Sequence, residues 1–170
     1  MMLYHATLES FEVGRTYTAN EITPYYRQNE LNGRAWVDDL LNHNKPENVP
    51  ERHNTFFACD CIENCYAYIS SRYPDRKADY KFYCVEMQNP VSGVMCLTDL
   101  LNDLGNNHPN LNIVVAEYWY PTKEWKYLEF LSQEMKVLDT VTPSQMQIFG
   151  SRVKYLHDYE MYKCWLKELK

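Results

Sequence analysis

The sequence has no run of apolar residues that approaches a length of about 20, which a helix needs to span a bilayer. Its start lacks the charged, then apolar, then small-residue pattern of a secretion signal. Basic residues are not in excess, because 17 Lys and Arg stand against 23 Asp and Glu. These absences predict a cytoplasmic protein with no membrane partner, and they disfavour broad binding to a nucleic-acid backbone, which needs concentrated positive charge.

The cysteines offer no pattern typical of a metal site. Three of the six, Cys59, Cys61 and Cys65, follow a C-x-C-x3-C spacing that fits neither a zinc ribbon nor a zinc finger, and no fourth ligand is evident. Since the sequence shows no export signal, we expect reduced cysteines and no bound metal.

What is present is the composition of a folded globule. Hydrophobic residues make up 45% of the 170 residues and charged residues 24%, without low-complexity tracts, so we expect a single domain over 1–170 with a core of its own. Aromatic residues reach 15%, including 15 tyrosines. This excess suits both a thick core and a pocket that stacks a planar ring.

Hydrophobic spacing predicts short strands separated by helices, which is an α+β class without a parallel βαβ sheet. The expected strands cover 1–7, 55–59, 78–87, 128–131 and 135–141, with a turn-rich link over 8–18. We expect helices over 19–43 with a break at Asn32-Gly33, from an Asp60 cap to Tyr73-Pro74, and late in 94–104 after a brief strand or turn. Residues 110–120 could form either a helix or a strand, and we favour a helix because Ala116-Glu117-Tyr118-Trp119 stands shortly before Pro121. After Thr142-Pro143-Ser144 the pattern allows either a strand or a helix.

Three short segments carry chemistry when they are read in order: Leu3-Tyr4-His5-Ala6-Thr7, Thr55-Phe56-Phe57-Ala58-Cys59, and Tyr127-Leu128-Glu129-Phe130-Leu131-Ser132. Together they resemble the His-Tyr-Glu branch of the ADP-ribosyltransferase superfamily, which includes diphtheria-toxin-like and poly-ADP-ribose-polymerase-like catalytic domains. The resemblance implies short, mostly antiparallel sheets split around an NAD cleft, with flanking helices. It also implies that NAD is the substrate, that nicotinamide is released, and that ADP-ribose passes to a protein or nucleic-acid acceptor without a metal.

Glu129 is the catalytic candidate. Cleavage of the nicotinamide–ribose bond builds positive charge on the ribose, as in glycoside hydrolysis, and a carboxylate beside the ribose stabilises that charge. Glu134 is the competing carboxylate, five residues on. We prefer Glu129, because Phe130-Leu131 continues the family pattern of an aromatic and an aliphatic residue.

The first segment is expected to bind the cofactor. The resemblance implies that His5 binds the adenosine-side ribose, and a histidine can offer hydroxyls one donor and one acceptor. Ala6 stands where the family has glycine, whose backbone N–H and C=O hold the nicotinamide carboxamide; alanine can do this if its φ is negative. Thr7 keeps the family's hydroxyl position.

The second segment is expected to supply aromatic rings and a cation. Phe56 falls where the family has tyrosine, so stacking on nicotinamide is kept and the hydroxyl is lost. Tyr66 or Tyr68, with Tyr68 preferred, would give the second ring of an aromatic sandwich. Arg52 either meets the NAD pyrophosphate or is a solvent-exposed loop residue.

Other functions stay open. The departures at Ala6 and Phe56 are compatible with a degenerate binding module, and an NAD glycohydrolase or an RNA 2′-phosphotransferase would use a related architecture. A cysteine hydrolase built on Cys59 and His53 is disfavoured. An arginine acceptor is disfavoured by Tyr127, because arginine-modifying relatives have Glu or Gln there. The resemblance implies a toxin, effector or conflict-system enzyme, with an antitoxin or a host target as partner.

Overall fold

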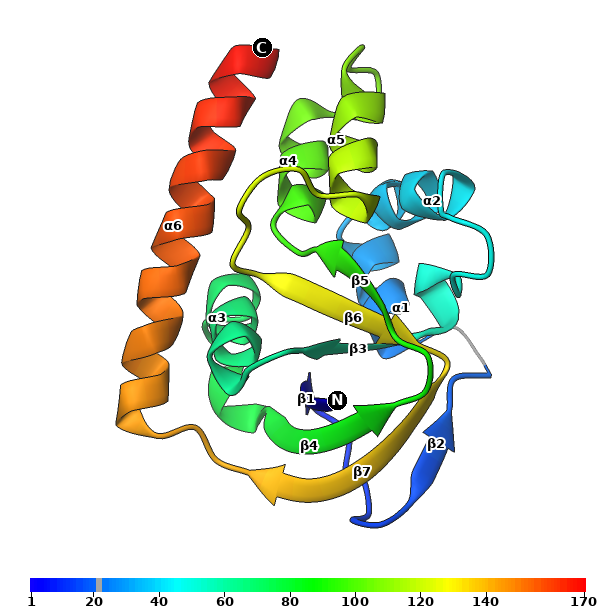
Figure 1. Ribbon diagram of the computed structural model, residues 1–170, viewed down its shortest axis with the longest axis vertical. Coiled ribbons are helices and arrows are strands. Elements are labelled where there is room, and N and C mark those ends of the chain that lie inside the picture. Colours follow the sequence, from blue (N-terminus) through cyan, green and yellow to red (C-terminus); the bar gives the residue numbers. More distant parts are fainter. Residues whose placement is uncertain (21–22) are drawn as a thin grey trace.

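The computed structural model describes residues 1–20 and 23–170, and within them it shows an α+β fold of six helices and one seven-stranded antiparallel sheet. The strand order is β2-β7-β4-β1-β3-β6-β5. Figure 1 shows α3 and α6 side by side, with α1, α2, α4 and α5 grouped toward the β5–β6 end of the sheet. The predicted α+β class and the antiparallel pairing of its strands are confirmed.

The strands are β1 Met2–Thr7, β2 Thr16–Thr18, β3 Phe56–Cys59, β4 Lys81–Met87, β5 Val91–Val94, β6 Leu128–Ser132 and β7 Glu134–Val141. The helices are α1 Pro24–Leu31, α2 Ala35–His43, α3 Ile62–Arg72, α4 Leu97–Leu104, α5 Leu111–Trp119 and α6 Gln145–Leu169, with short 3-10 turns η1 Arg52–Asn54 and η2 Lys77–Asp79. None of the helices in the described part of the chain is both long and apolar enough to cross a bilayer.

Most of the expected elements are present, with differences at β2 and at the start of α3. The chain breaks between α1 and α2 as predicted, where Gly33 has a φ of 67° that favours glycine. A short strand, β2, lies in the segment that was expected to be only a link. Asp60 does not cap α3: the N-cap is Cys61, and Asp60 instead accepts a hydrogen bond from the Asn64 side chain at 2.7 Å.

The C-terminal segment is a helix, which settles the alternative that its sequence left open. The Ser144 hydroxyl accepts a hydrogen bond from the backbone N–H of Gln147 at 3.2 Å, and the Gln147 side chain accepts one from the N–H of Ser144 at 2.7 Å. This reciprocal capping box fixes the start of α6 directly after Pro143.

The sheet opens at the seam between β1 and β3. β1 pairs with β4 at every position from Met2 to Thr7, whereas it pairs with β3 only at Tyr4 and Cys59. Past Tyr4, therefore, the side of β1 that faces β3 has no ladder partner. The strand order nevertheless runs through this seam without a break, so the described residues form one seven-stranded sheet rather than the expected separate sheets, with only a short pairing between β1 and β3.

The two faces of the sheet have different cores. Because directly paired residues point to the same face, Tyr4, Cys59 and Glu129 share one face, against which α3 packs through Ile62 and Ile69. On the opposite face an aromatic and aliphatic cluster forms around Leu3, Ala58, Tyr83, Val85, Met135 and Val137. The seam is therefore the place where residues from both faces can meet.

Candidate active site

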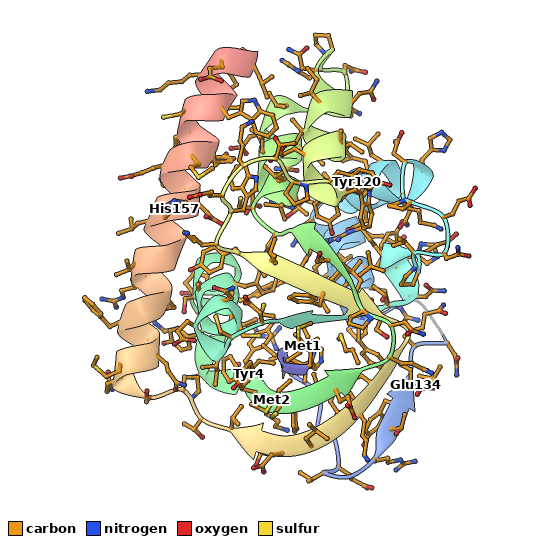
Figure 2. The ribbon with its side chains drawn as sticks, in the orientation of Figure 1. Met1, Met2, Tyr4, Tyr120, Glu134 and His157 are labelled. Atoms are coloured by element: carbon orange, nitrogen blue, oxygen red, sulfur yellow. The ribbon has the colours of Figure 1, made fainter. Side chains whose placement is uncertain are left out.

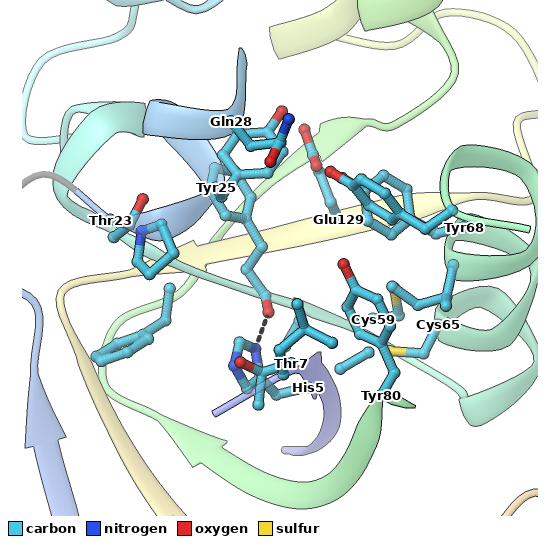
Figure 3. Close-up of a pocket in the computed structure, with 18 of the residues that line it drawn as sticks. His5, Thr7, Thr23, Tyr25, Gln28, Cys59, Cys65, Tyr68, Tyr80 and Glu129 are labelled. Atoms are coloured by element: carbon cyan, nitrogen blue, oxygen red, sulfur yellow. Dashed lines mark hydrogen bonds between the residues drawn. The ribbon is translucent and has the colours of Figure 1, made fainter. Parts of the chain in front are cut away.

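A cavity of about 410 Å³ lies at the β1–β3 seam. Its lining includes residues from β1, β3, α1, α3 and β6, among them His5, Ala6, Thr7, Phe56, Tyr68 and Glu129. In Figure 3, His5 and Thr7 lie at the lower end of the cavity, and Glu129, Tyr68, Tyr25 and Gln28 at the upper end. All of the site residues expected from the sequence except Arg52 therefore line one cavity.

His5 bridges the seam. Its Nδ1 lies 2.6 Å from the backbone oxygen of Phe57 (Figure 3), and because a carbonyl can only accept, Nδ1 carries the proton. Burial lowers the pKa of His5 by more than this hydrogen bond raises it, so the ring is neutral at pH 7 and Nε2 is an acceptor. The prediction that His5 offers a ligand both a donor and an acceptor is therefore wrong in one respect. The Nδ1–H donor is already bonded to the backbone oxygen of Phe57, so only the Nε2 acceptor is left for a ligand.

Ala6 and Thr7 continue β1 along the cavity wall. Ala6 pairs with Phe82 of β4 in a regular strand, and its φ is not positive, so alanine meets the condition for replacing glycine here. The Thr7 hydroxyl accepts a hydrogen bond from the N–H of Glu9 at 3.1 Å, which turns the chain as it leaves the strand.

Phe56 lines the cavity from the His5 side of the sheet. Its ring is edge-on to His5 at 6.1 Å, and alternation along β3 puts it on the face opposite Glu129. Phe57 lies on the Glu129 face, where its ring packs at 4.7 Å against Tyr25. The sequence did not identify Phe57 or Tyr25, because nothing in a run of two phenylalanines shows which one faces the carboxylate.

Tyr68 and Tyr66 are separated by the geometry of α3. Tyr68 lines the cavity. Tyr66 instead stacks on Phe82 of β4 at 6.2 Å, within the core under α3. The preference for Tyr68 thus agrees with its position, although Tyr68 lies on the Glu129 face and does not form a sandwich with Phe56 across the sheet.

Glu129 and Glu134 also differ in position. Glu129 is the second residue of β6, is 6% exposed, and lines the cavity. Glu134 begins β7 and pairs with Thr18 of the edge strand β2, and it is labelled in Figure 2. Of the two carboxylates, Glu129 is the one that a ligand in the cavity could reach.

Arg52 is neither a solvated loop residue nor a wall of the cavity. Its side chain is 0% exposed, and it makes ion pairs of 2.6 Å with Asp38 and 2.7 Å with Glu129. Burial lowers the pKa of Arg52, but the neighbouring Glu129, Tyr118 and Asp38 raise it well above its ordinary value, so the guanidinium stays charged. Arg52 therefore forms buried ion pairs with Asp38 and Glu129 instead of contacting a pyrophosphate. The local sequence around Arg52 did not indicate these pairs, because both carboxylates are distant in the chain.

Arg76 is a basic residue of the cavity that no sequence pattern indicated. Among the described residues it is the only Arg or Lys that lines the cavity. Its side chain is 58% exposed and lies 3.8 Å from Asp79, a long ion pair that leaves it able to turn toward a ligand.

Cys59, which lines the cavity, is in the thiol form. A hydrogen bond with Cys65 and burial raise the pKa of Cys59 well above its ordinary value, which makes it a poor nucleophile. His53 lies 2.7 Å from Glu51 and does not line the cavity, so a Cys59–His53 hydrolase finds no support. None of the six cysteines forms a disulfide, and in the described part of the chain no group of three or more His, Cys, Asp or Glu side chains could hold a metal ion.

The sequence matches no protein-family model, and no curated protein matches it at a significant level.

Proposed function

We propose that this protein is an NAD-dependent ADP-ribosyltransferase that binds NAD across the β1–β3 seam and breaks its nicotinamide–ribose bond beside Glu129. One observation carries the proposal. His5, Phe56, Tyr68 and Glu129 come from four separate segments of the chain, and all four line a single cavity. Its volume of about 410 Å³ falls within the range of about 300–1,000 Å³ that is usual for ligand pockets.

Glu129 supplies the electrostatic part of the reaction. As nicotinamide leaves, positive charge develops on the ribose carbon and ring oxygen, and a buried carboxylate next to the ribose stabilises that charge more strongly than water would. The same carboxylate can accept a hydrogen bond from the ribose 2′-hydroxyl and orient the incoming nucleophile.

From the lining we infer one direction for the dinucleotide. The nicotinamide half would lie on the face of Glu129, with Tyr68 and Phe57 as aromatic walls and the backbone of Ala6 at its carboxamide. The adenosine-side ribose would donate a hydroxyl hydrogen bond to Nε2 of His5. Arg76 replaces Arg52 as the cation for the pyrophosphate.

The test is incubation of the purified protein with NAD labelled in its adenylate half, alone and with a cell lysate. We expect release of nicotinamide and transfer of the label to protein or nucleic acid. Glu129→Gln should lower turnover by about a hundredfold or more while NAD still binds, because only the charge is removed. Glu134→Gln is the matched control and should keep full activity.

Each result separates one function from the others. Label recovered only as free ADP-ribose would make the protein an NAD glycohydrolase. NAD binding without turnover would make it a binding module on this fold. Wild-type turnover by Glu129→Gln would end the assignment of Glu129, and absence of both NAD binding and turnover would end the proposal.

A further inference from the structure

The two oxygens of the Glu129 carboxylate have different surroundings. Oε1 accepts a hydrogen bond from Nη1 of Arg52 at 2.7 Å and another from the hydroxyl of Tyr118 at 2.6 Å. Within the described part of the chain, Oε2 accepts none. Since Glu129 lines the cavity, one oxygen is held by the protein and the other is left for a ligand.

Arg52 is itself held on several sides. Its Nε donates to Oδ1 of Asp38 at 2.6 Å, and Oδ2 of Asp38 accepts from the side chain of Asn29 at 2.8 Å. The guanidinium also lies 4.8 Å from the centre of the Phe57 ring. The planar guanidinium binds Asp38 through Nε and Glu129 through Nη1. Because these two nitrogens have a fixed geometry, the bond to Asp38 fixes the direction from which Arg52 donates to Glu129.

Tyr118 reaches the same oxygen from α5, on the other side. Its hydroxyl also accepts a hydrogen bond from Arg52. Burial is the largest of the effects that raise the pKa of Tyr118 well above its ordinary value, so the hydroxyl stays protonated and remains a donor to Glu129. Two independent donors from different elements therefore converge on Oε1.

Gly93 makes this approach possible. It is the β5 residue that pairs directly with Glu129, and a Cβ added at Gly93 would overlap the ring of Tyr118. Glycine in the interior of a strand often marks such a close approach of another group. Gly93 is buried, so an added methyl group could be accommodated only if the Tyr118 ring or the strand moved.

We propose that Arg52 and Tyr118 are positioning residues, which hold Oε1 of Glu129 so that Oε2 faces the substrate, and that Gly93 gives Tyr118 the room to do so. Asp38 fixes Arg52 in turn. The catalytic role of the oriented Glu129 carboxylate rests on the proposed function. The orientation of Glu129 by Arg52 and Tyr118 does not depend on NAD.

The first experiment needs no turnover. In protein with ¹³C-labelled glutamate, the side-chain carboxyl resonance of Glu129 is assigned by its loss in Glu129→Gln, and its chemical shift is compared between variants at pH 7. Tyr118→Phe removes one hydrogen-bond donor to Oε1, so the carboxyl resonance should move by more than its line width. The control is Tyr127→Phe, which also removes a buried hydroxyl, but one bonded to the backbone oxygen of Ser151.

A Glu129 resonance in Tyr118→Phe that stays within its line width of the wild-type position, or a shift matched by Tyr127→Phe, would overturn the proposal whether or not the protein cleaves NAD. A shift in Tyr118→Phe that is absent from Tyr127→Phe supports it. Arg52→Lys keeps a positive charge and loses the fork, and it should also shift the resonance in a folded protein.

Kinetics add the consequence for catalysis. Tyr118→Phe should lower kcat by about ten- to a hundredfold, with little change in KM for NAD. Unchanged kcat in Tyr118→Phe, in a preparation whose wild type turns over NAD, would overturn the positioning role. A wild type that does not turn over NAD counts against the proposed function alone, and the carboxyl resonance then decides the orientation.

Discussion

Gly93 and Glu129 face each other across the β5–β6 ladder, and the ring of Tyr118 occupies the space that a side chain at position 93 would need. The structure of the carboxylate site therefore depends on the absence of a single methyl group. Replacing Gly93, which has no reactive side chain, therefore tests how Tyr118 is placed beside Glu129.

Gly93→Ala should destabilise the protein by about 1–3 kcal/mol, because the new methyl group overpacks a buried contact. It should also lower kcat by displacing the Tyr118 hydroxyl from Glu129. Urea unfolding and NAD cleavage measure the two effects. Gly150→Ala in α6 is the control: its Cβ would lie at an ordinary 3.4 Å from the side chain of Glu63, so it should stabilise the helix by up to about 1 kcal/mol.

If Gly93→Ala is as stable and active as the wild type, Tyr118 does not need the close approach. If Gly150→Ala is equally harmful, the effect at position 93 is only the general cost of replacing a glycine.

Arg52→Met should cost about 3–5 kcal/mol of unfolding free energy, because it leaves the carboxylates of Asp38 and Glu129 buried without their cation. Arg15→Ala breaks an exposed pair with Glu12 and should cost less than about 1 kcal/mol. Both values come from urea denaturation at pH 7. A loss at position 52 no larger than that at position 15 would mean that the buried network contributes nothing to the fold.

Much of the fold could be predicted from local patterns in the sequence. The strands at β1, β3 and β6 follow from short apolar and aromatic runs, and the α1–α2 break follows from Asn32-Gly33. β2 has only three residues, too few to show a period, so it could not be distinguished from a loop. The cap at Asp60 was wrong by one position, because capping depends on backbone dihedrals that residue type does not fix.

The site residues also divide into those that a local pattern indicates and those that depend on contacts distant in the chain. His5, Ala6, Thr7, Phe56, Tyr68 and Glu129 lie in short segments with a recognisable pattern, and all of them line the cavity. The contacts of Arg52 could not be predicted, because Glu129 is 77 residues away and Tyr118 is 66 residues away. Only the folded chain brings these residues together. The role of Gly93, which leaves space for the Tyr118 ring beside Glu129, is visible only from the register of β5 with β6.

Arg76→Gln should raise KM for NAD several-fold and leave kcat nearly unchanged, since a cation on the pyrophosphate binds ground state and transition state alike. The KM of the wild type should also rise more steeply with salt than that of the variant. Lys77→Gln, one residue away and outside the cavity, is the matched control. Equal KM values for wild type and Arg76→Gln would show that the pyrophosphate is bound elsewhere.

His5→Gln tests the neutral histidine at the seam by its effect on stability against pH. The pKa of His5 is lowered from 6.5 in the folded protein, chiefly by burial, so below pH 6.5 the unfolded chain binds a proton that the folded one does not. The stability that comes from a neutral His5 is therefore complete above that value and is lost as the pH falls below it. Glutamine does not titrate. The unfolding free energy of the wild type minus that of His5→Gln should therefore fall as the pH is lowered from 7.5 to 5, and should stay constant above pH 7.5.

The other four histidines and all the carboxylates are common to both proteins, so their titration largely cancels in this difference. A difference that is flat through the whole range would mean that His5 takes up its proton as readily in the folded state as in the unfolded one. Nε2 would then be a donor below pH 6.5. The acceptor role toward a ribose hydroxyl requires the opposite, so the same titration that measures stability also decides what His5 can offer to a ligand.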